Sequence, residues 1–150
     1  MNTLMNIFTY GSLMFEPVWS TVVVGTYARR KARLFGYQRR KLKGETYPAL
    51  IPGKHLDFVD GIIYFDVDSK DKVRLDRFEG AYYTKKMETL TLTDNRLVTA
   101  QVYVFRPEYQ ALVDEESWSP EWFEKTGIHN FMAAYEGYKW IHSTTREKKS

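Results

Sequence analysis

The sequence predicts an α+β domain in which the strands form a curled or closed sheet. Two observations carry this prediction. Short β-prone segments, separated by glycine- and turn-rich breaks, make up most of the 150 residues. Helix-start signatures occur at only a few places. No repeat or low-complexity linker divides the chain, so we expect one domain over residues 1–142 and a polar C-terminal tail over residues 143–150.

The first half of the chain is expected to contain one helix among several strands. Residues 4–10 predict the first strand. Glu16-Pro17 marks a helix start, because proline is accepted in the first helical turn. This helix is expected to end at Gly25, although the valines just before that glycine favour a strand. Strand segments are expected over residues 32–43 and 49–51, around Gly36 and Gly44-Glu45-Thr46, and a further strand is expected over residues 60–67.

The second half is expected to contain a helix, a hairpin and a second helix. Ser69 is the expected N-cap of a helix over residues 70–78, and Gly80 is expected to end it. The hairpin has its expected turn at Asp94-Asn95 and its strands at residues 83–93 and 97–105. Ser119-Pro120-Glu121 marks the last helix start. Its inward-facing residues are expected to be Trp122, Phe123, Ile128, Phe131, Met132 and Tyr135.

The composition excludes several classes of protein. There is no cysteine, so disulfides, thiolate metal ligands and a cysteine nucleophile are all absent. The three histidines lack the spacing of metal ligands, and we therefore expect no metal site. The N-terminus lacks the pattern of a signal peptide, and no apolar stretch approaches the roughly 18 residues that span a bilayer. We expect a cytoplasmic protein that does not enter membranes.

A basic segment between residues 29 and 43 is the one feature that favours nucleic acid. The net charge is only +3, but eight cationic residues fall within this segment. They are Arg29, Arg30, Lys31, Arg33, Arg39, Arg40, Lys41 and Lys43. Most of these charges alternate with apolar residues, as on the solvated face of a strand. RNA or anion binding through residues 29–43 is therefore the weaker alternative.

The segment Tyr10-Gly11-Ser12-Leu13 follows the first expected strand. A glycine after a strand allows a positive φ or a close approach of the backbone to a ligand. Successive N–H groups of residues 11–13 can then form a concave anion-binding nest. The alternative interpretation is an ordinary turn between a strand and a helix.

Glu79 lies at the expected end of the helix over residues 70–78, among aromatic residues. The helix dipole and partial desolvation both disfavour its charged form, and both therefore raise its pKa. A carboxylate of that kind is a better general base near neutral pH. The alternative interpretation is a solvated glutamate at a helix end.

Six segments of the chain share the order and spacing of one family's motifs over roughly residues 4–106. They are Phe8-Thr9-Tyr10-Gly11-Ser12-Leu13, Ala32-Arg33-Leu34-Phe35-Gly36-Tyr37, Tyr47-Pro48-Ala49, Val59-Asp60-Gly61-Ile62-Ile63-Tyr64, Leu75-Asp76-Arg77-Phe78-Glu79-Gly80 followed by Tyr83, and Ala100-Gln101-Val102-Tyr103-Val104. In these segments the chain resembles the γ-glutamyl cyclotransferase-like superfamily, in its plant avirulence-induced-gene-like branch.

The resemblance implies a small mixed β-barrel of about six strands with flanking helices. It also implies an enzyme that releases 5-oxoproline and an amine from a small γ-glutamyl compound, without metal or cofactor. Glu79 matches the general acid/base, and Tyr10, Gly11, Ser12 and Leu13 match the substrate-binding loop. Tyr83 is expected to support substrate binding by hydrogen bonds. A non-catalytic ligand-binding module on the same fold is the alternative.

One position departs from the resemblance. Many family members carry arginine two places after the tyrosine that matches Tyr83, and this chain has Lys85 there. Lysine keeps the charge but lacks the bidentate fork of a guanidinium group. A substrate-binding role is therefore not carried over to Lys85.

Overall fold

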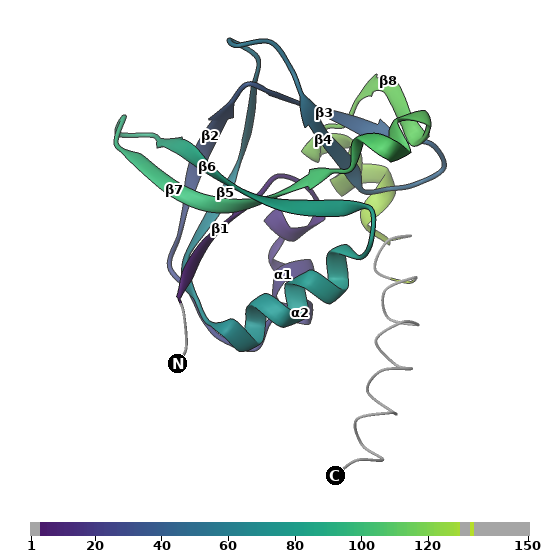
Figure 1. The fold of residues 1–150 in the computed structure, drawn as a ribbon. Coiled ribbons are helices and arrows are strands. Elements are labelled where there is room, and N and C mark those ends of the chain that lie inside the picture. The colour runs from purple at the N-terminus through teal and green to yellow at the C-terminus, as the bar shows by residue number, and fades with distance from the viewer. Residues whose placement is uncertain (1–3, 130–132, 134–150) are drawn as a thin grey trace.

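The structure is a computed structural model and describes residues 4–129 and residue 133. Five strands form a closed barrel: β1 (Met5–Thr9), β2 (Arg29–Phe35), β5 (Phe58–Val67), β6 (Tyr83–Leu92) and β7 (Leu97–Phe105). Around the barrel the order is β1-β5-β2-β6-β7, as Figure 1 shows. Strands β1 and β7 close the barrel as a parallel pair, whereas the other neighbours are antiparallel.

A second, three-stranded sheet has the order β4-β3-β8. Its strands are β3 (Tyr37–Leu42), β4 (Pro48–Pro52) and β8 (Val113–Ser117). The α+β class and the mixed barrel are confirmed. The barrel closes with five strands instead of about six, because the strand expected over residues 49–51 is β4, which pairs with β3 in the second sheet. Gly36 has a φ of 88°, which favours glycine, and the chain after it joins the second sheet.

Two helices flank the barrel on one side. The helical segments are η1 (Ser12–Met14), α1 (Glu16–Val22), α2 (Ser69–Glu79), η2 (Pro107–Leu112), α3 (Pro120–Trp122) and the π-helical η3 (Phe123–Gly127). Helices α1 and α2 contact each other and lie together below the barrel in Figure 1. The C-terminal end of α2 thereby reaches the region between the barrel and the second sheet.

The ends of both flanking helices differ from expectation. Helix α1 ends at Val22 instead of reaching Gly25, because the β-branched residues after it adopt extended backbone. Helix α2 is capped by Asp68 instead of Ser69, and the Asp68 carboxylate accepts the backbone N–H of Asp71 at 2.8 Å. Gly80 ends α2 as predicted and has a φ of 77°, which favours glycine, but its ψ of −161° is not that of the left-handed helical cap expected there.

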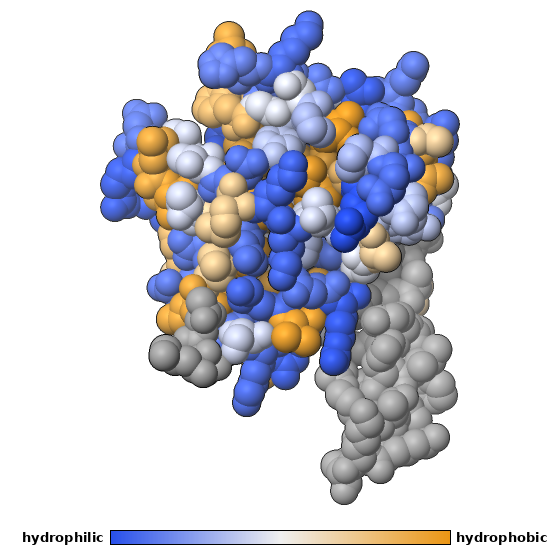
Figure 2. Space-filling model, in the orientation of Figure 1, coloured by the Kyte–Doolittle hydropathy of each residue, from blue (hydrophilic) through white to orange (hydrophobic). Residues whose placement is uncertain are grey.

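The apolar residues form two buried clusters. The first cluster fills the barrel interior and includes Phe8, Leu34, Ile63 and Leu90. The second lies between the barrel wall and the helices, where the rings of Trp19 and Tyr64 stack with centroids 3.6 Å apart. On the face drawn in Figure 2, hydrophilic residues cover most of the surface and apolar residues form small separate patches.

The C-terminal region differs most from the sequence prediction. Strand β8 and helix η2 were not predicted, and the described part of the last helix begins as the short α3 and continues as a π-helix. Phe123 is buried there against Trp118, with ring centroids 5.5 Å apart. The expected packing positions 131, 132 and 135 and the tail 143–150 lie outside the described residues.

Candidate active site

A cavity of about 430 Å³ opens where the end of β1, the β3–β4 loop, the end of α2 and the start of β6 meet. The walls combine these four segments with one residue of β7. They are formed by Phe8, Thr9, Tyr10, Gly11, Ser12, Leu13, Gly44, Glu45, Thr46, Tyr47, Pro48, Arg77, Phe78, Glu79, Tyr82, Tyr83 and Tyr103. All six site residues predicted from the sequence therefore line one cavity.

Glu79 is the last residue of α2 and is half-buried in this wall. Its carboxyl group has no hydrogen-bond or ion-pair partner among the residues that the structure describes. Burial, and secondly the negative charge of Asp76, raise the pKa of Glu79 to about 8. The environment differs from that of a solvated glutamate at a helix end. With a pKa of about 8, the Glu79 carboxyl group can accept and release a proton near neutral pH.

The turn after β1 forms another part of the cavity wall. The backbone N–H groups of Gly11, Ser12 and Leu13 donate to no acceptor within the described part of the chain. Three neighbouring donors are thus available to an anionic group in the cavity. Gly11 has φ −130° and ψ −135°, so the positive φ considered for this glycine is not used.

Gly11 is required by close packing against protein atoms. A Cβ at position 11 would lie 2.7 Å from Cδ and 2.8 Å from Cγ of Pro48. Real Cβ atoms do not approach carbon atoms so closely. The glycine thus allows β4 to pack directly onto the turn.

The hydroxyl groups of Tyr10 and Tyr83, two tyrosines of the cavity wall, donate to backbone carbonyl oxygens of the protein. The Tyr83 hydroxyl donates to the Pro48 carbonyl at 2.7 Å, and the Tyr10 hydroxyl donates to the Tyr103 carbonyl. Neither donates to Glu79. Burial raises the pKa of Tyr10 and of Tyr83 well above the ordinary range, so both keep their protons. These hydroxyl groups fix the cavity walls and leave their oxygen lone pairs to accept from a ligand.

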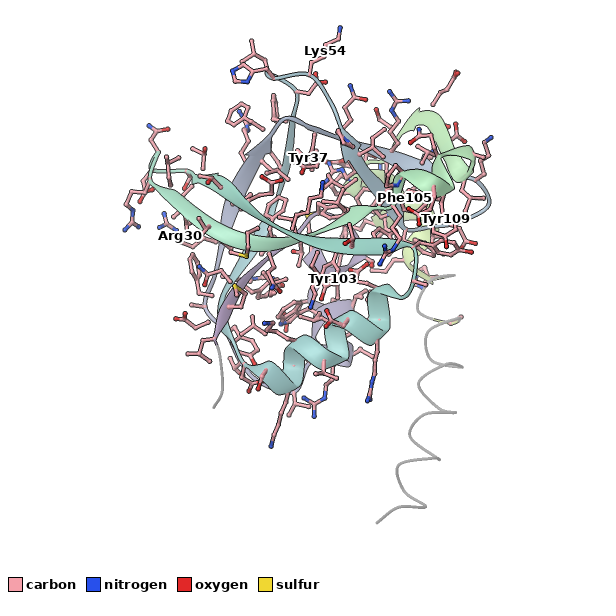
Figure 3. All side chains as sticks on the ribbon, viewed as in Figure 1. Arg30, Tyr37, Lys54, Tyr103, Phe105 and Tyr109 are labelled. Carbon is pink, nitrogen blue, oxygen red and sulfur yellow. The ribbon has the colours of Figure 1, made fainter. Side chains whose placement is uncertain are left out.

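Tyr103 and Asp76 were not predicted as site residues. Tyr103 lies between β7 and α2 (Figure 3), and its hydroxyl donates to Oδ1 of Asp76 at 2.6 Å. Oδ2 of Asp76 accepts from the Lys85 ammonium at 3.0 Å. The only available signal was that both residues lie inside the quoted motifs, which does not reveal a contact between positions 27 residues apart.

Arg39 of the basic segment binds the backbone of Tyr10, at the start of the turn that follows β1. Its guanidinium donates through Nη1 to the Tyr10 carbonyl at 2.8 Å and to the Asp60 carbonyl at 3.1 Å. It also lies 5.2 Å from the centroid of the Trp118 ring. Burial lowers the pKa of Arg39. This cation therefore serves the internal packing of the turn.

Other cations of the basic segment form ion pairs. The pairs are Arg29–Glu16 at 3.6 Å, Arg30–Asp94 at 3.2 Å, Arg33–Asp60 at 2.7 Å and Lys41–Glu116 at 3.1 Å. This distribution gives no support to a continuous basic surface for nucleic acid. Within residues 4–129 and 133, no helix is long and apolar enough to cross a membrane. Among the same residues, no group of potential metal ligands gathers.

Comparisons with known proteins agree with the fold and with the motifs. A family model described as gamma-glutamyl cyclotransferase, AIG2-like, matches residues 7–120. AIG2-like protein D of Arabidopsis thaliana is 30% identical over 122 residues, which cover 77% of this chain and 80% of that protein. The chain therefore belongs to the gamma-glutamyl cyclotransferase, AIG2-like family.

Solved structures show the same architecture. The solution structure of an Arabidopsis thaliana protein aligns with a TM-score of 0.64 and 26% identity, over 95% of this chain and 93% of that one. A structure named gamma-glutamyl cyclotransferase aligns with a TM-score of 0.59 and 15% identity, over 71% of this chain and 68% of that one. At that identity the second likeness shows a shared fold.

Proposed function

We propose that this chain is an enzyme that releases 5-oxoproline and an amine from a small γ-glutamyl compound. One observation carries the proposal. Glu79, with a pKa of about 8, shares a cavity with three unpaired amides of residues 11–13. The cavity volume of about 430 Å³ lies within the roughly 300–1,000 Å³ of small-molecule sites. Membership of the family supports the same reaction class.

In the proposed reaction, the Glu79 carboxylate takes a proton from the α-ammonium group of the substrate. The freed amine nitrogen attacks the γ-carbonyl carbon and forms the new C–N bond of a five-membered ring. Glu79 then gives the proton to the leaving nitrogen as the original C–N bond breaks. The attacking nitrogen loses its second proton to the returned Glu79 carboxylate, which passes it to the departing amine, so that the products are the lactam N–H and an ammonium ion. With a pKa of about 8, about one tenth of Glu79 is ionised at pH 7. The pKa of Glu79 is also close to the value of about 8 for an α-amino group, the group that Glu79 must deprotonate.

The walls of the cavity supply the remaining requirements. Because the attack is intramolecular, holding the glutamyl unit in a ring-closing pose contributes much of the acceleration. The amides of residues 11–13 provide donors for an anion, either the α-carboxylate of the substrate or the oxyanion that develops at the γ-carbonyl. Tyr10 and Tyr83 shape the floor on which the substrate lies.

The proposal is tested with a panel of γ-glutamyl dipeptides and γ-glutamyl amines, with 5-oxoproline followed by mass spectrometry. We expect release from at least one compound. Glu79→Gln should abolish release while the circular dichroism spectrum stays that of the parent, because the shape is kept and the proton acceptor is lost. Glu108→Gln, which removes a carboxylate from an exposed position of η2, is the matched control.

Two results would contradict the proposal. Turnover by Glu79→Gln at the parent rate would remove Glu79 as the general base. Calorimetric binding of γ-glutamyl compounds by the parent without any 5-oxoproline would favour a non-catalytic binding module that retains the cavity.

A further inference from the structure

We propose that Asp76 is a positioning residue for Glu79, which holds the last turn of α2 against the barrel and places a fixed negative charge one helical turn from the Glu79 carboxyl group. This inference rests on the proposed function of the cavity. Asp76 does not line that cavity. Its effect on the reaction therefore passes through Glu79.

The contacts of Asp76 join α2 to two barrel strands. Tyr103 of β7 donates its hydroxyl to Oδ1 at 2.6 Å, and Lys85 of β6 donates its ammonium to Oδ2 at 3.0 Å. Lys85 and Tyr103 are direct partners in the β6–β7 ladder, so their side chains leave the same face of the sheet. Both carboxylate oxygens of Asp76 are thus held by one cross-strand pair.

This clamp acts on the helix next to Glu79. Residues three apart on a helix lie on neighbouring surface positions, so Asp76 and Glu79 share one side of α2. Tyr103 also connects the clamp to the turn after β1, because its carbonyl accepts the hydroxyl of Tyr10 beside the amides of residues 11–13. The end of α2 and the turn after β1 are therefore tied to the same residue of β7.

The charge of Asp76 adds to the effect of burial on Glu79. The titratable or charged groups that line the cavity with Glu79 are Tyr10, Glu45, Tyr47, Arg77, Tyr82, Tyr83 and Tyr103. Asp76 is the anion that raises the pKa of Glu79, after burial. Lys85 neutralises part of this charge through the ion pair.

The same clamp gives Lys85 a role. This lysine stands where many family members carry arginine, and it does not line the cavity. A single ammonium suffices for one carboxylate oxygen, because Tyr103 already occupies the other. Lys85 thus acts on Glu79 through Asp76.

The first test needs no turnover. The Glu79 side-chain carboxyl carbon is titrated by NMR in carbon-13-labelled full-length protein, with Glu79→Gln used to assign the signal. In Asp76→Asn the midpoint should fall by about one pH unit, because a nearby negative charge is lost. In Lys85→Met it should rise, because Asp76 loses its counter-charge. Asp66→Asn and Lys86→Met, which remove the same charges from exposed sites, should leave the midpoint unchanged.

Opposite shifts in the two variants support the proposal, since a general loss of packing would not move the midpoint in both directions. Unchanged midpoints, or shifts of the same sign in both variants, overturn it. Should Asp76→Asn fail to fold, the surface variant Lys85→Met with its Lys86→Met control still decides. If the parent released no 5-oxoproline, the proposed reaction would be contradicted, but the outcome of this titration would not be affected.

The second test separates positioning from charge in the reaction itself. The limb of kcat/KM that rises with pH should move to lower pH in Asp76→Asn and to higher pH in Lys85→Met, as Glu79 must be ionised to act. At the pH optimum, Asp76→Asn should lose at least tenfold in kcat with little change in KM, because the carboxyl group is no longer fixed. A rise in KM with unchanged kcat and unchanged pH limbs would assign Asp76 to substrate binding and contradict positioning.

Discussion

Gly11 and Pro48 are packed so closely that a β-carbon on Gly11 would lie 2.7 Å from the proline ring. The contact joins the amide turn after β1 to strand β4 of the second sheet. Because Pro48 and residues 11–13 all line the cavity, we expect this contact to hold the turn in its place in the cavity wall.

Gly11→Ala is therefore expected to damage both stability and activity. Overpacking of a tight contact costs about 1–3 kcal/mol, and relief requires the turn or β4 to move. Urea denaturation should report that loss, and 5-oxoproline release should fall at least tenfold. Adding Pro48→Ala to Gly11→Ala should restore part of both, since the proline ring is the obstacle. Parent-like stability of Gly11→Ala would show that the turn is not held in this way.

Tyr83→Phe should weaken the attachment of β4 to β6 while the volume of the cavity stays nearly the same. The lost bond from the Tyr83 hydroxyl to the Pro48 carbonyl, at 2.7 Å, leaves a buried acceptor without its donor, which costs about 1–3 kcal/mol. We expect lower stability and a raised KM, since the Pro48 wall shifts. Tyr109→Phe is the control, because the Tyr109 hydroxyl makes no hydrogen bond to the residues that the structure describes. Equal stability of both variants would argue against a structural role for the Tyr83 hydroxyl.

Local patterns predicted the hairpin and α2 well. The strands expected over residues 83–93 and 97–105 agree with β6 and β7 within two residues. Asn95 in the expected turn has a φ of 68°, which asparagine tolerates better than most residues. The helix expected over residues 70–78 became α2. In each case the signal lies within the segment itself, so no distant partner was needed.

Segments whose partners lie far along the chain were not predictable. Strand β8 is rich in acidic residues and lacks an apolar alternation, yet it pairs with the basic β3 through contacts such as Lys41–Glu116. The separation of the strands into a barrel and a second sheet, and the order of the barrel, likewise depend on strand pairing. The residues of the candidate site show the same difference between local signals and distant contacts. Glu79 and the turn at Gly11 stood out locally, whereas Asp76 and Arg39 gained their roles from contacts with residues 27 and 29 positions away in the chain.

Asp71 should be the main anchor between α1 and α2, at the end of α2 remote from Glu79. Its buried carboxylate accepts the N–H groups of Val24 and Gly25, the Tyr27 hydroxyl and the Arg74 guanidinium, at 2.6–2.9 Å. Asp71→Ala removes all four bonds and should cost about 3–5 kcal/mol. Urea denaturation measures this, with Asp66→Asn as the control. A loss below about 1 kcal/mol would contradict the anchoring role.

The same carboxylate makes a prediction about acid. These donors lower the pKa of Asp71 in the folded protein, although burial alone would raise it. A carboxyl group with a lowered folded pKa stabilises the protein above its unfolded pKa and loses that contribution as pH falls through the folded value. Parent protein should therefore lose stability on acidification below about pH 4, and Asp71→Ala should lose less over the same range. Parallel curves would show that Asp71 does not carry the acid sensitivity.

Glu79 should have the opposite effect on the pH dependence of stability. Its pKa is about 8 in the folded protein against 4.5 for an ordinary glutamate, so the folded state retains a proton that the unfolded chain has released. That proton contributes stability below pH 4.5, and the contribution is lost as pH rises through the folded pKa of about 8. The total should be about 3–5 kcal/mol.

Glu79→Gln lacks this titration, and its stability relative to the parent should therefore increase between pH 5 and pH 9. Urea denaturation at both pH values measures the difference. Glu108→Gln should keep the parent's decline, since that side chain lies outside the cavity. If the parent and Glu79→Gln declined equally, the Glu79 carboxyl group would have to be hydrated in the folded protein. It would then lack the proton affinity that the proposed ring closure requires.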